Sequence, residues 1–195
     1  MNEPRHRTMR VGLVRHGETD WNAEGRVQGS ADRPLSERGK TQILELGKSL
    51  RGSNWERIIS SPLRRAVVSA ELMSSVLELP APQIDERLAE RSYGVAEGYS
   101  VSQAKLLFPE QAEVAGREDP SVFRGRVYSA LDDLAELDCD AVLVVTHGEA
   151  IAALLEHMGK TVPRVLAGSL HEITLERPGD KRSTIRPRDC RDTQS

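Results

Sequence analysis

Two histidines occur in the same local context at widely separated points of the chain. His16 stands two residues after the apolar run 11–14, His147 stands two residues after the apolar run 141–145, and each histidine precedes glycine and glutamate. Short apolar runs of this kind are typical of buried strands. Because ligands of open parallel sheets bind beyond the carboxyl ends of the strands, we expect both imidazoles to meet in one ligand crevice.

Arginines accompany this predicted crevice. Arg15 directly precedes the first histidine, and Arg64 lies in the run 60–65, at the start of a helix that follows another strand end. We expect Arg64 to point into the crevice, because guanidinium groups bind phosphate oxygens through two parallel hydrogen bonds and a helix N-terminus adds partial positive charge. Gly17 and Gly148, which follow the histidines, allow the backbone to approach a ligand closely. The predicted site therefore traps an anion.

Alternating strands and helices position these residues. We expect strands at 11–14, 57–60, 141–145 and 170–176, an extended segment at 84–89, a short amphipathic piece at 101–108, and helices at 36–50, 66–77, 120–137 and 149–158. This alternation predicts an α/β fold of three layers, with a mostly parallel central sheet and helices on both faces. We expect a single domain over residues 1–195, with residues 1–8 and 189–195 flexible.

The composition argues against several classes of protein. With 27 basic and 30 acidic residues the net charge is -3, which lacks the basic excess typical of nucleic-acid-binding domains. Cys139 and Cys190 are too few for a disulfide framework, and residues 1–10 show no apolar run typical of a leader or membrane anchor. Neither paired cysteines nor an HExxH motif accompany His147, so we expect no metal and no cofactor. A cytoplasmic location fits these features best.

Several motifs resemble those of the histidine phosphatase superfamily, which includes the phosphoglycerate mutases. In order, they are LVRHGET at 13–19, WN at 21–22, RVQG at 26–29, PLSERG at 34–39, SSPLRRA at 60–66, LAER at 88–91 and VVTHG at 144–148. Because the motifs occur in this order over most of the chain, the resemblance is more specific than a single RHG triplet. It implies a phosphoglycerate mutase-like fold and phosphoryl transfer through histidine without a metal.

The resemblance implies a role for each residue around the phosphoryl group. His16 is the expected nucleophile, because a neutral imidazole can attack phosphorus and form a phosphohistidine. Arg15, Arg64 and a protonated His147 are expected to surround the phosphoryl oxygens, and Asn22 adds a neutral donor. Charge stabilisation and positioning of this kind supply most of the catalysis of phosphoryl transfer.

The resemblance also assigns the general acid and the surrounding pocket. Glu90 is expected to protonate the leaving alkoxide; the residues alone do not distinguish it from Glu86 or Glu97. A useful acid at neutral pH needs a raised pKa, which burial can supply. The remaining expected substrate-binding residues are Gln28, Gly29, Tyr93 and Gly148.

The core residues do not separate hydrolysis from mutase chemistry, since one phosphohistidine can pass its phosphoryl group to water or to a second hydroxyl. The glycolytic mutases of the family are longer and carry extra basic residues after the general acid, whereas residues 101–118 offer only Lys105 and Arg117. We therefore predict a phosphomonoesterase of the histidine acid phosphatase type. The alternatives are mutase-type phosphoryl transfer and a catalytically silent phosphate-binding module.

The expected partner is a small phosphorylated metabolite, with neither nucleic acid nor membrane. Its identity depends on residues 95–120, where the motifs run out. A homodimer is compatible with the sequence, which leaves the oligomeric state open.

Overall fold

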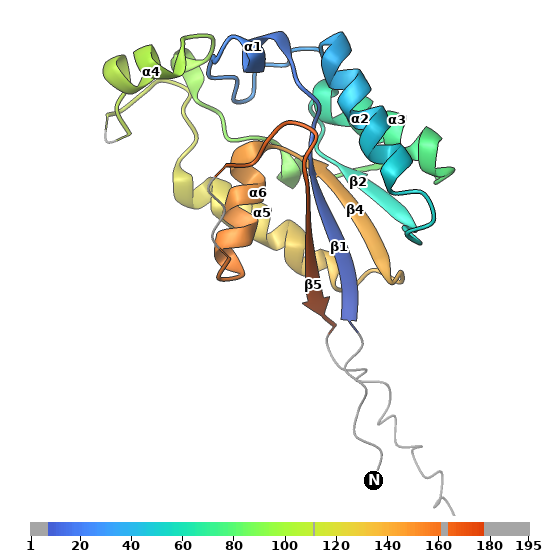
Figure 1. Ribbon diagram of the computed structural model, residues 1–195. Coiled ribbons are helices and arrows are strands. Elements are labelled where there is room, and N and C mark those ends of the chain that lie inside the picture. Colours follow the sequence, from blue (N-terminus) through green and yellow to red (C-terminus); the bar gives the residue numbers. More distant parts are fainter. Residues whose placement is uncertain (1–7, 111, 161–163, 178–195) are drawn as a thin grey trace, which may run out of the picture.

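The computed structural model describes residues 8–110, 112–160 and 164–177 of the chain (Figure 1). We expect residues 1–8 and 189–195 to be flexible, but Thr8 begins the first strand. Residues 1–7 and 189–195, and with them Cys190, lie outside the described residues. Cys139 is buried with a free thiol.

The strands of the described chain form one sheet in the order β3-β2-β4-β1-β5. They are β1 (Thr8–Arg15), β2 (Arg57–Ser60), β3 (Gln83–Ile84), β4 (Ala141–Thr146) and β5 (Leu170–Glu176). Neighbouring strands among β3, β2, β4 and β1 pair in parallel, and only β5 runs antiparallel, along the outer side of β1. This topology confirms the predicted α/β fold with a mostly parallel sheet.

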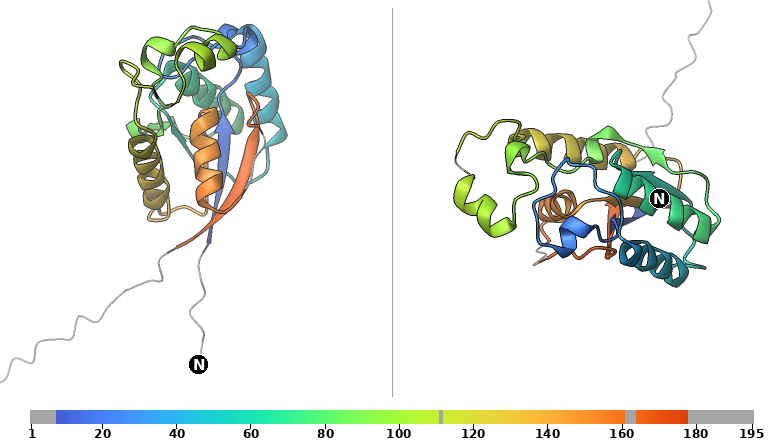
Figure 2. Two further views of the ribbon diagram at one scale, coloured as in Figure 1. Left: turned by 90° about the vertical axis from the view of Figure 1, so that its left-hand side faces the viewer. Right: turned by 90° about the horizontal axis from the view of Figure 1, so that it is seen from above.

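Helices cover both faces of the sheet (Figures 1 and 2). On one face lie α2 (Glu37–Ser49) and α3 (Arg64–Leu77), and on the other lie α5 (Pro120–Leu134) and α6 (Gly148–His157). At the start of α2, Ser36 accepts a hydrogen bond from the Gly39 N–H at 3.0 Å and so satisfies a free donor in the first turn of the helix.

The central strands β1 and β4 are buried on both faces. In β4, Val142 and Val144 pack into the core beneath α5 and α6, and the alternate residues Leu143 and Val145 pack beneath α2 and α3. Because successive strand residues point to opposite faces, a strand between two helical layers needs a continuous apolar run, which explains why β4 was readable from the sequence.

Several segments differ from the prediction: β1 begins at Thr8 and not at residue 11, and α3 begins at Arg64 and not at residue 66. The segment at 84–89 is extended only in β3; residues Glu86–Leu88 form a 3-10 turn, η1, because the Asp85 carboxylate accepts the Arg87 N–H at 2.9 Å. The helix expected over 120–137 ends at Leu134. The short helix α1 (Asp20–Ala23), which begins with a capping box, was not predicted.

Short elements lie beyond the carboxyl ends of the parallel strands. Figure 1 shows α1 and α4 (Val101–Leu107) at this end of the sheet, and the 3-10 turn η2 (Gly94–Ala96) lies in the chain between η1 and α4. They are positioned to cover a site at the strand ends. Among the described helices, none has the length and apolar character needed to cross a membrane.

Candidate active site

The two histidines meet as predicted, at the ends of neighbouring central strands. In the parallel pairing of β1 with β4, Arg15 lies opposite Thr146, so the next residue of each strand is a histidine at the same level. The rings of His16 and His147 are buried, with centroids 5.1 Å apart. The strand register therefore builds the pair directly.

The His16 ring is held with one nitrogen available for nucleophilic attack. Its Nδ1 lies 2.6 Å from the Gly17 carbonyl oxygen, which can only accept, so the proton is assigned to Nδ1. Nε2 then carries a lone pair and accepts a hydrogen bond from Arg65 Nε at 3.2 Å. Burial, followed by the charges of Arg65 and Arg15, lowers the pKa of His16 well below its usual range. The ring is thus neutral at neutral pH.

The arginine from α3 is Arg65, and the prediction of Arg64 was wrong. Arg64 is exposed, and its backbone N–H, rather than its side chain, binds the Asp32 carboxylate. Arg65 is 1% exposed and donates to the carbonyl oxygens of Ala31 at 2.7 Å and Gly29 at 2.6 Å. It also remains charged at neutral pH, since burial lowers its pKa only to about 10.

Helical geometry explains the correction. Successive residues of an α-helix are about 100° apart around the axis. The buried stripe of α3 includes Ala66, Ala70 and Met73, which places Arg65 at the edge of that stripe and Arg64 opposite its centre. The apolar spacing was readable from the sequence and would have selected Arg65.

Arg15 and His147 each keep an unpartnered nitrogen in the described structure. Arg15 donates from Nη1 to the Val165 carbonyl at 2.7 Å, while its buried Nε has no partner. His147 Nε2 lies 2.6 Å from the Ser61 hydroxyl, and its Nδ1 has none. Burial, followed by the charges of Arg65 and His16, lowers the pKa of His147. The protonated form that we predicted therefore requires the negative charge of a bound phosphate.

Gln28 directs a third unpartnered nitrogen into the site. Its Oε1 accepts hydrogen bonds from the Thr19 hydroxyl at 2.9 Å and from Asn22 Nδ2 at 3.1 Å, which fixes the orientation of the amide. Its Nε2 is buried without a partner among the described residues. Buried unsatisfied donors are rare and call for an explanation; an oxygen-rich anion would satisfy them.

Glu90 lies beside these cationic groups. Its carboxylate oxygens accept the backbone N–H groups of Arg91 at 3.1 Å and Glu149 at 3.3 Å. Burial, followed by the negative charge of Glu149, raises the pKa of Glu90, and the Arg65 charge opposes this. Glu90 therefore holds its proton to higher pH than an exposed glutamate does.

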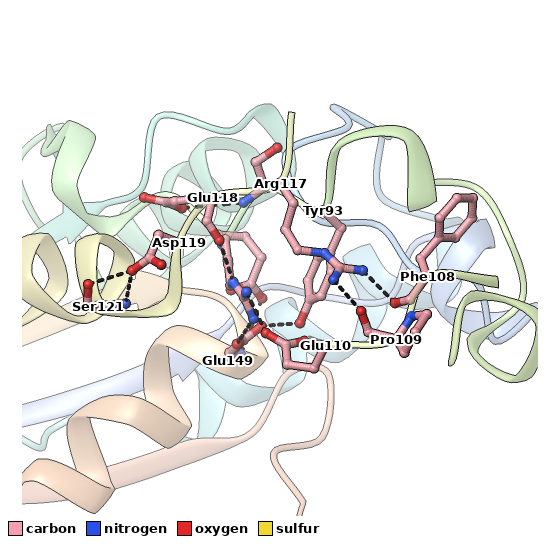
Figure 3. A network of polar contacts seen from close by, with 12 residues as sticks. Tyr93, Phe108, Pro109, Glu110, Arg117, Glu118, Asp119, Ser121 and Glu149 are labelled. Carbon is pink, nitrogen blue, oxygen red and sulfur yellow. Dashed lines mark hydrogen bonds and ion pairs between the residues drawn. The ribbon is translucent and has the colours of Figure 1, made fainter. Parts of the chain in front are cut away.

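Tyr93 and Glu149 form the adjoining wall of the site (Figure 3). The Tyr93 hydroxyl donates to the Glu149 carboxylate, and Arg91 Nη1 lies 3.5 Å from the other oxygen of that carboxylate. Arg91 also binds Glu110 at 2.7 Å. Sequence reasoning gave no role to Glu149 or Arg91, although Glu149 belongs to the repeated His-Gly-Glu pattern.

A cavity of about 560 Å³ joins these groups to the covering elements. Eight of the ten predicted site residues line it: Arg15, His16, Asn22, Gln28, Gly29, Glu90, Tyr93 and Gly148. The other two are the exposed Arg64 and the fully buried His147. The far end of the cavity is lined by α4 and the chain after it, including Val101, Ala104, Lys105 and Phe108.

The described residues contain no group of three or more His, Cys, Asp or Glu side chains placed to hold a metal ion. The polar groups that surround His16 are instead mainly nitrogen donors. An arrangement of this kind binds a phosphoryl group and stabilises the charge that develops on its oxygens.

The chain belongs to the histidine phosphatase superfamily (branch 1), whose family model matches residues 11–175. It is 35% identical over 156 residues to the uncharacterized phosphatase PhoE of Bacillus subtilis, covering 80% of each chain. It is 34% identical over 158 residues to the probable phosphoglycerate mutase GpmB of Salmonella choleraesuis, covering 75% of this chain and 73% of the relative. A mycobacterial glucosyl-3-phosphoglycerate phosphatase structure aligns with TM-score 0.74 and 26% identity, covering 86% of this chain and 91% of the other.

Proposed function

We propose that the chain is a phosphomonoester hydrolase that acts on a small phosphorylated metabolite, without a metal, through a phosphohistidine on His16. The observation that carries the proposal is the unprotonated Nε2 of His16 at a cavity wall, surrounded by the donors of Arg15, Arg65 and Gln28. A neutral nucleophile inside an anion-binding shell suits attack on a phosphate ester.

The reaction proceeds in two displacements. His16 Nε2 attacks phosphorus while the ester P–O bond breaks, and Glu90 gives its proton to the leaving alkoxide. The Glu90 carboxylate then takes a proton from water as that water attacks the phosphohistidine, the P–N bond breaks, and inorganic phosphate leaves. Arg15 and Arg65 carry fixed positive charge next to the phosphoryl oxygens throughout, which lowers both barriers.

The hydrogen bonds of two arginines near the cavity bear on the choice of water as the final acceptor. Arg117 donates to the carbonyl oxygens of Pro109 at 2.9 Å and Phe108 at 2.6 Å, and Arg91 is occupied by Glu110 and Glu149. A mutase must hold the carboxylate of phosphoglycerate during transfer, and Arg91, which already faces two carboxylates, is poorly suited to that. Relatives named phosphatase favour the same conclusion, whereas the relative named mutase keeps mutase transfer as the alternative.

Trapping the intermediate tests the proposal. The protein is incubated with p-nitrophenyl phosphate in EDTA, quenched in alkali, which preserves phosphohistidine, and digested for mass spectrometry. We expect turnover and one phosphoryl group on the peptide that contains His16, and neither with His16→Ala. Binding without turnover would instead indicate a silent phosphate-binding module, and isomerisation of 3-phosphoglycerate in preference to phosphate release would indicate a mutase.

A further inference from the structure

A second carboxyl group lies beside the proposed general acid. Glu149 follows Gly148 in the first turn of α6, and its backbone N–H donates to an oxygen of Glu90 at 3.3 Å. Its own carboxylate lies on the same wall of the cavity. The two displacements described above use Glu90 and leave Glu149 without a role.

The partners of Glu149 hold its side chain as a hydrogen-bond acceptor. One carboxylate oxygen accepts a hydrogen bond from the Tyr93 hydroxyl (Figure 3), and the other lies 3.5 Å from Arg91 Nη1. The Arg91 side chain is 4% exposed, so this cation is itself held in place. In contrast, within the described part of the chain, the carboxylate oxygens of Glu90 accept hydrogen bonds from backbone N–H groups only. The two carboxyl groups are therefore not equivalent.

Most charged groups near Glu90 favour the loss of its proton. The titratable and charged side chains that act on the Glu90 carboxyl group are Arg15 from the end of β1, Arg65 from α3, Glu149 from α6 and Tyr93 from its own loop. Arg126 from α5 donates to the Glu90 backbone carbonyl at 3.2 Å. Among these, Glu149 is the negative charge. A general acid surrounded by arginines would otherwise ionise and stop donating.

We propose that Glu149 is a positioning residue that keeps Glu90 in its protonated, proton-donating form. This rests on the proposed hydrolase function. The role also extends to the second displacement: after Glu90 has given its proton to the alkoxide, two carboxylates face the same wall. Their repulsion makes Glu90 a better base toward the attacking water, so the same neighbour assists both steps.

The test uses Glu149→Gln, which removes the charge but keeps the backbone N–H to Glu90 and an oxygen acceptor for Tyr93. The matched control is Glu110→Gln, which removes the other carboxylate bound to Arg91, at 2.7 Å, and leaves Glu149 in place. The pH profile of kcat/KM is measured with glycerol 2-phosphate, whose alkoxide needs a proton, and with p-nitrophenyl phosphate, whose leaving group needs none. Ionisation of the substrate affects all variants alike.

With glycerol 2-phosphate, we expect Glu149→Gln to move the alkaline limb about one pH unit lower, a loss of about tenfold above that limb, with activity recovered on the acid side. The limb with p-nitrophenyl phosphate should stay in place, and Glu110→Gln should not move either limb. A change in KM without a shifted limb, or equal shifts in both variants, would mean that Glu149 only anchors Arg91, and the proposal would be wrong.

Thermal unfolding confirms that each variant is folded. Should Glu149→Gln fail to fold, Glu149→Ala removes the same charge without placing an amide in the site, and the same limb shift is expected from it. Failure of the hydrolase proposal looks different, because the wild-type protein would then release phosphate from neither substrate.

Discussion

The adjacent arginines at the start of α3 provide a matched pair for testing the site. Arg65 is 1% exposed and its guanidinium reaches His16 Nε2 at 3.2 Å, whereas Arg64 is exposed and its side chain has no hydrogen bond or ion pair among the described residues. Exchanging each for lysine or alanine therefore probes the same segment with opposite expectations.

The expected loss follows from the contacts of Arg65. A preorganised donor aimed at developing charge is worth about 2.7–4 kcal/mol, or about 10²–10³ in kcat. Arg65→Ala should lose this amount, and it also leaves the Gly29 and Ala31 carbonyls without their donor, at about 1–3 kcal/mol of stability each. Arg65→Lys keeps the charge but not the planar fork, so we expect it to recover only part of the rate.

The assay is kcat and KM for p-nitrophenyl phosphate, with thermal unfolding as a check on the fold. Both substitutions of Arg64 should change kcat/KM less than about twofold, because exposed side chains without partners contribute within about 0.5 kcal/mol. If Arg64→Ala loses as much activity as Arg65→Ala in folded protein, the assignment of the phosphoryl-binding arginine to Arg65 is refuted.

Two further predictions concern single groups of the site. Gln28→Glu keeps the acceptor for Thr19 and Asn22 but places a carboxylate where the unpartnered Nε2 lies, so kcat/KM should fall roughly tenfold or more; an unchanged value would remove Gln28 from the phosphate site. The depressed pKa of His147 means that the unfolded chain binds more protons below the usual histidine pKa of about 6.5, so stability falls as pH falls through that range. Between pH 7.5 and 5 the melting temperature should drop less in His147→Gln than in the wild type, and equal drops would contradict the assignment.

The sequence predicts best what strand geometry alone determines. His16 and His147 were placed together because apolar runs mark the central strands and parallel neighbours end at one edge. The prediction of Arg64 is wrong because a strand end followed by a helix does not show which of two adjacent arginines faces inward; the spacing of the buried Ala66, Ala70 and Met73 does.

Other features have no comparable signal in the sequence. The contact of Glu149 with Tyr93 joins residues 56 positions apart, and no local pattern specifies such a pair. The turn η1 depends on the Asp85 side chain, which takes the Arg87 N–H that a strand would otherwise use. The spacing of apolar residues does not reveal local hydrogen bonds of this kind. The orientation of the Gln28 amide likewise arises only once Thr19 and Asn22 are folded around it.

Because the histidines follow β1 and β4, evolution can change the far end of the cavity more easily than it can change the histidine pair. Both rings follow strands that are enclosed by helices on each face, so their spacing can shift only if the interior of the molecule shifts. The far end of the cavity is instead built from α4 and the chain around it. Substitutions there can change which alcohol portion of a phosphate ester fits the cavity, while the phosphoryl group still lies against the same imidazoles. The preferred substrate can therefore change without a change in the reaction.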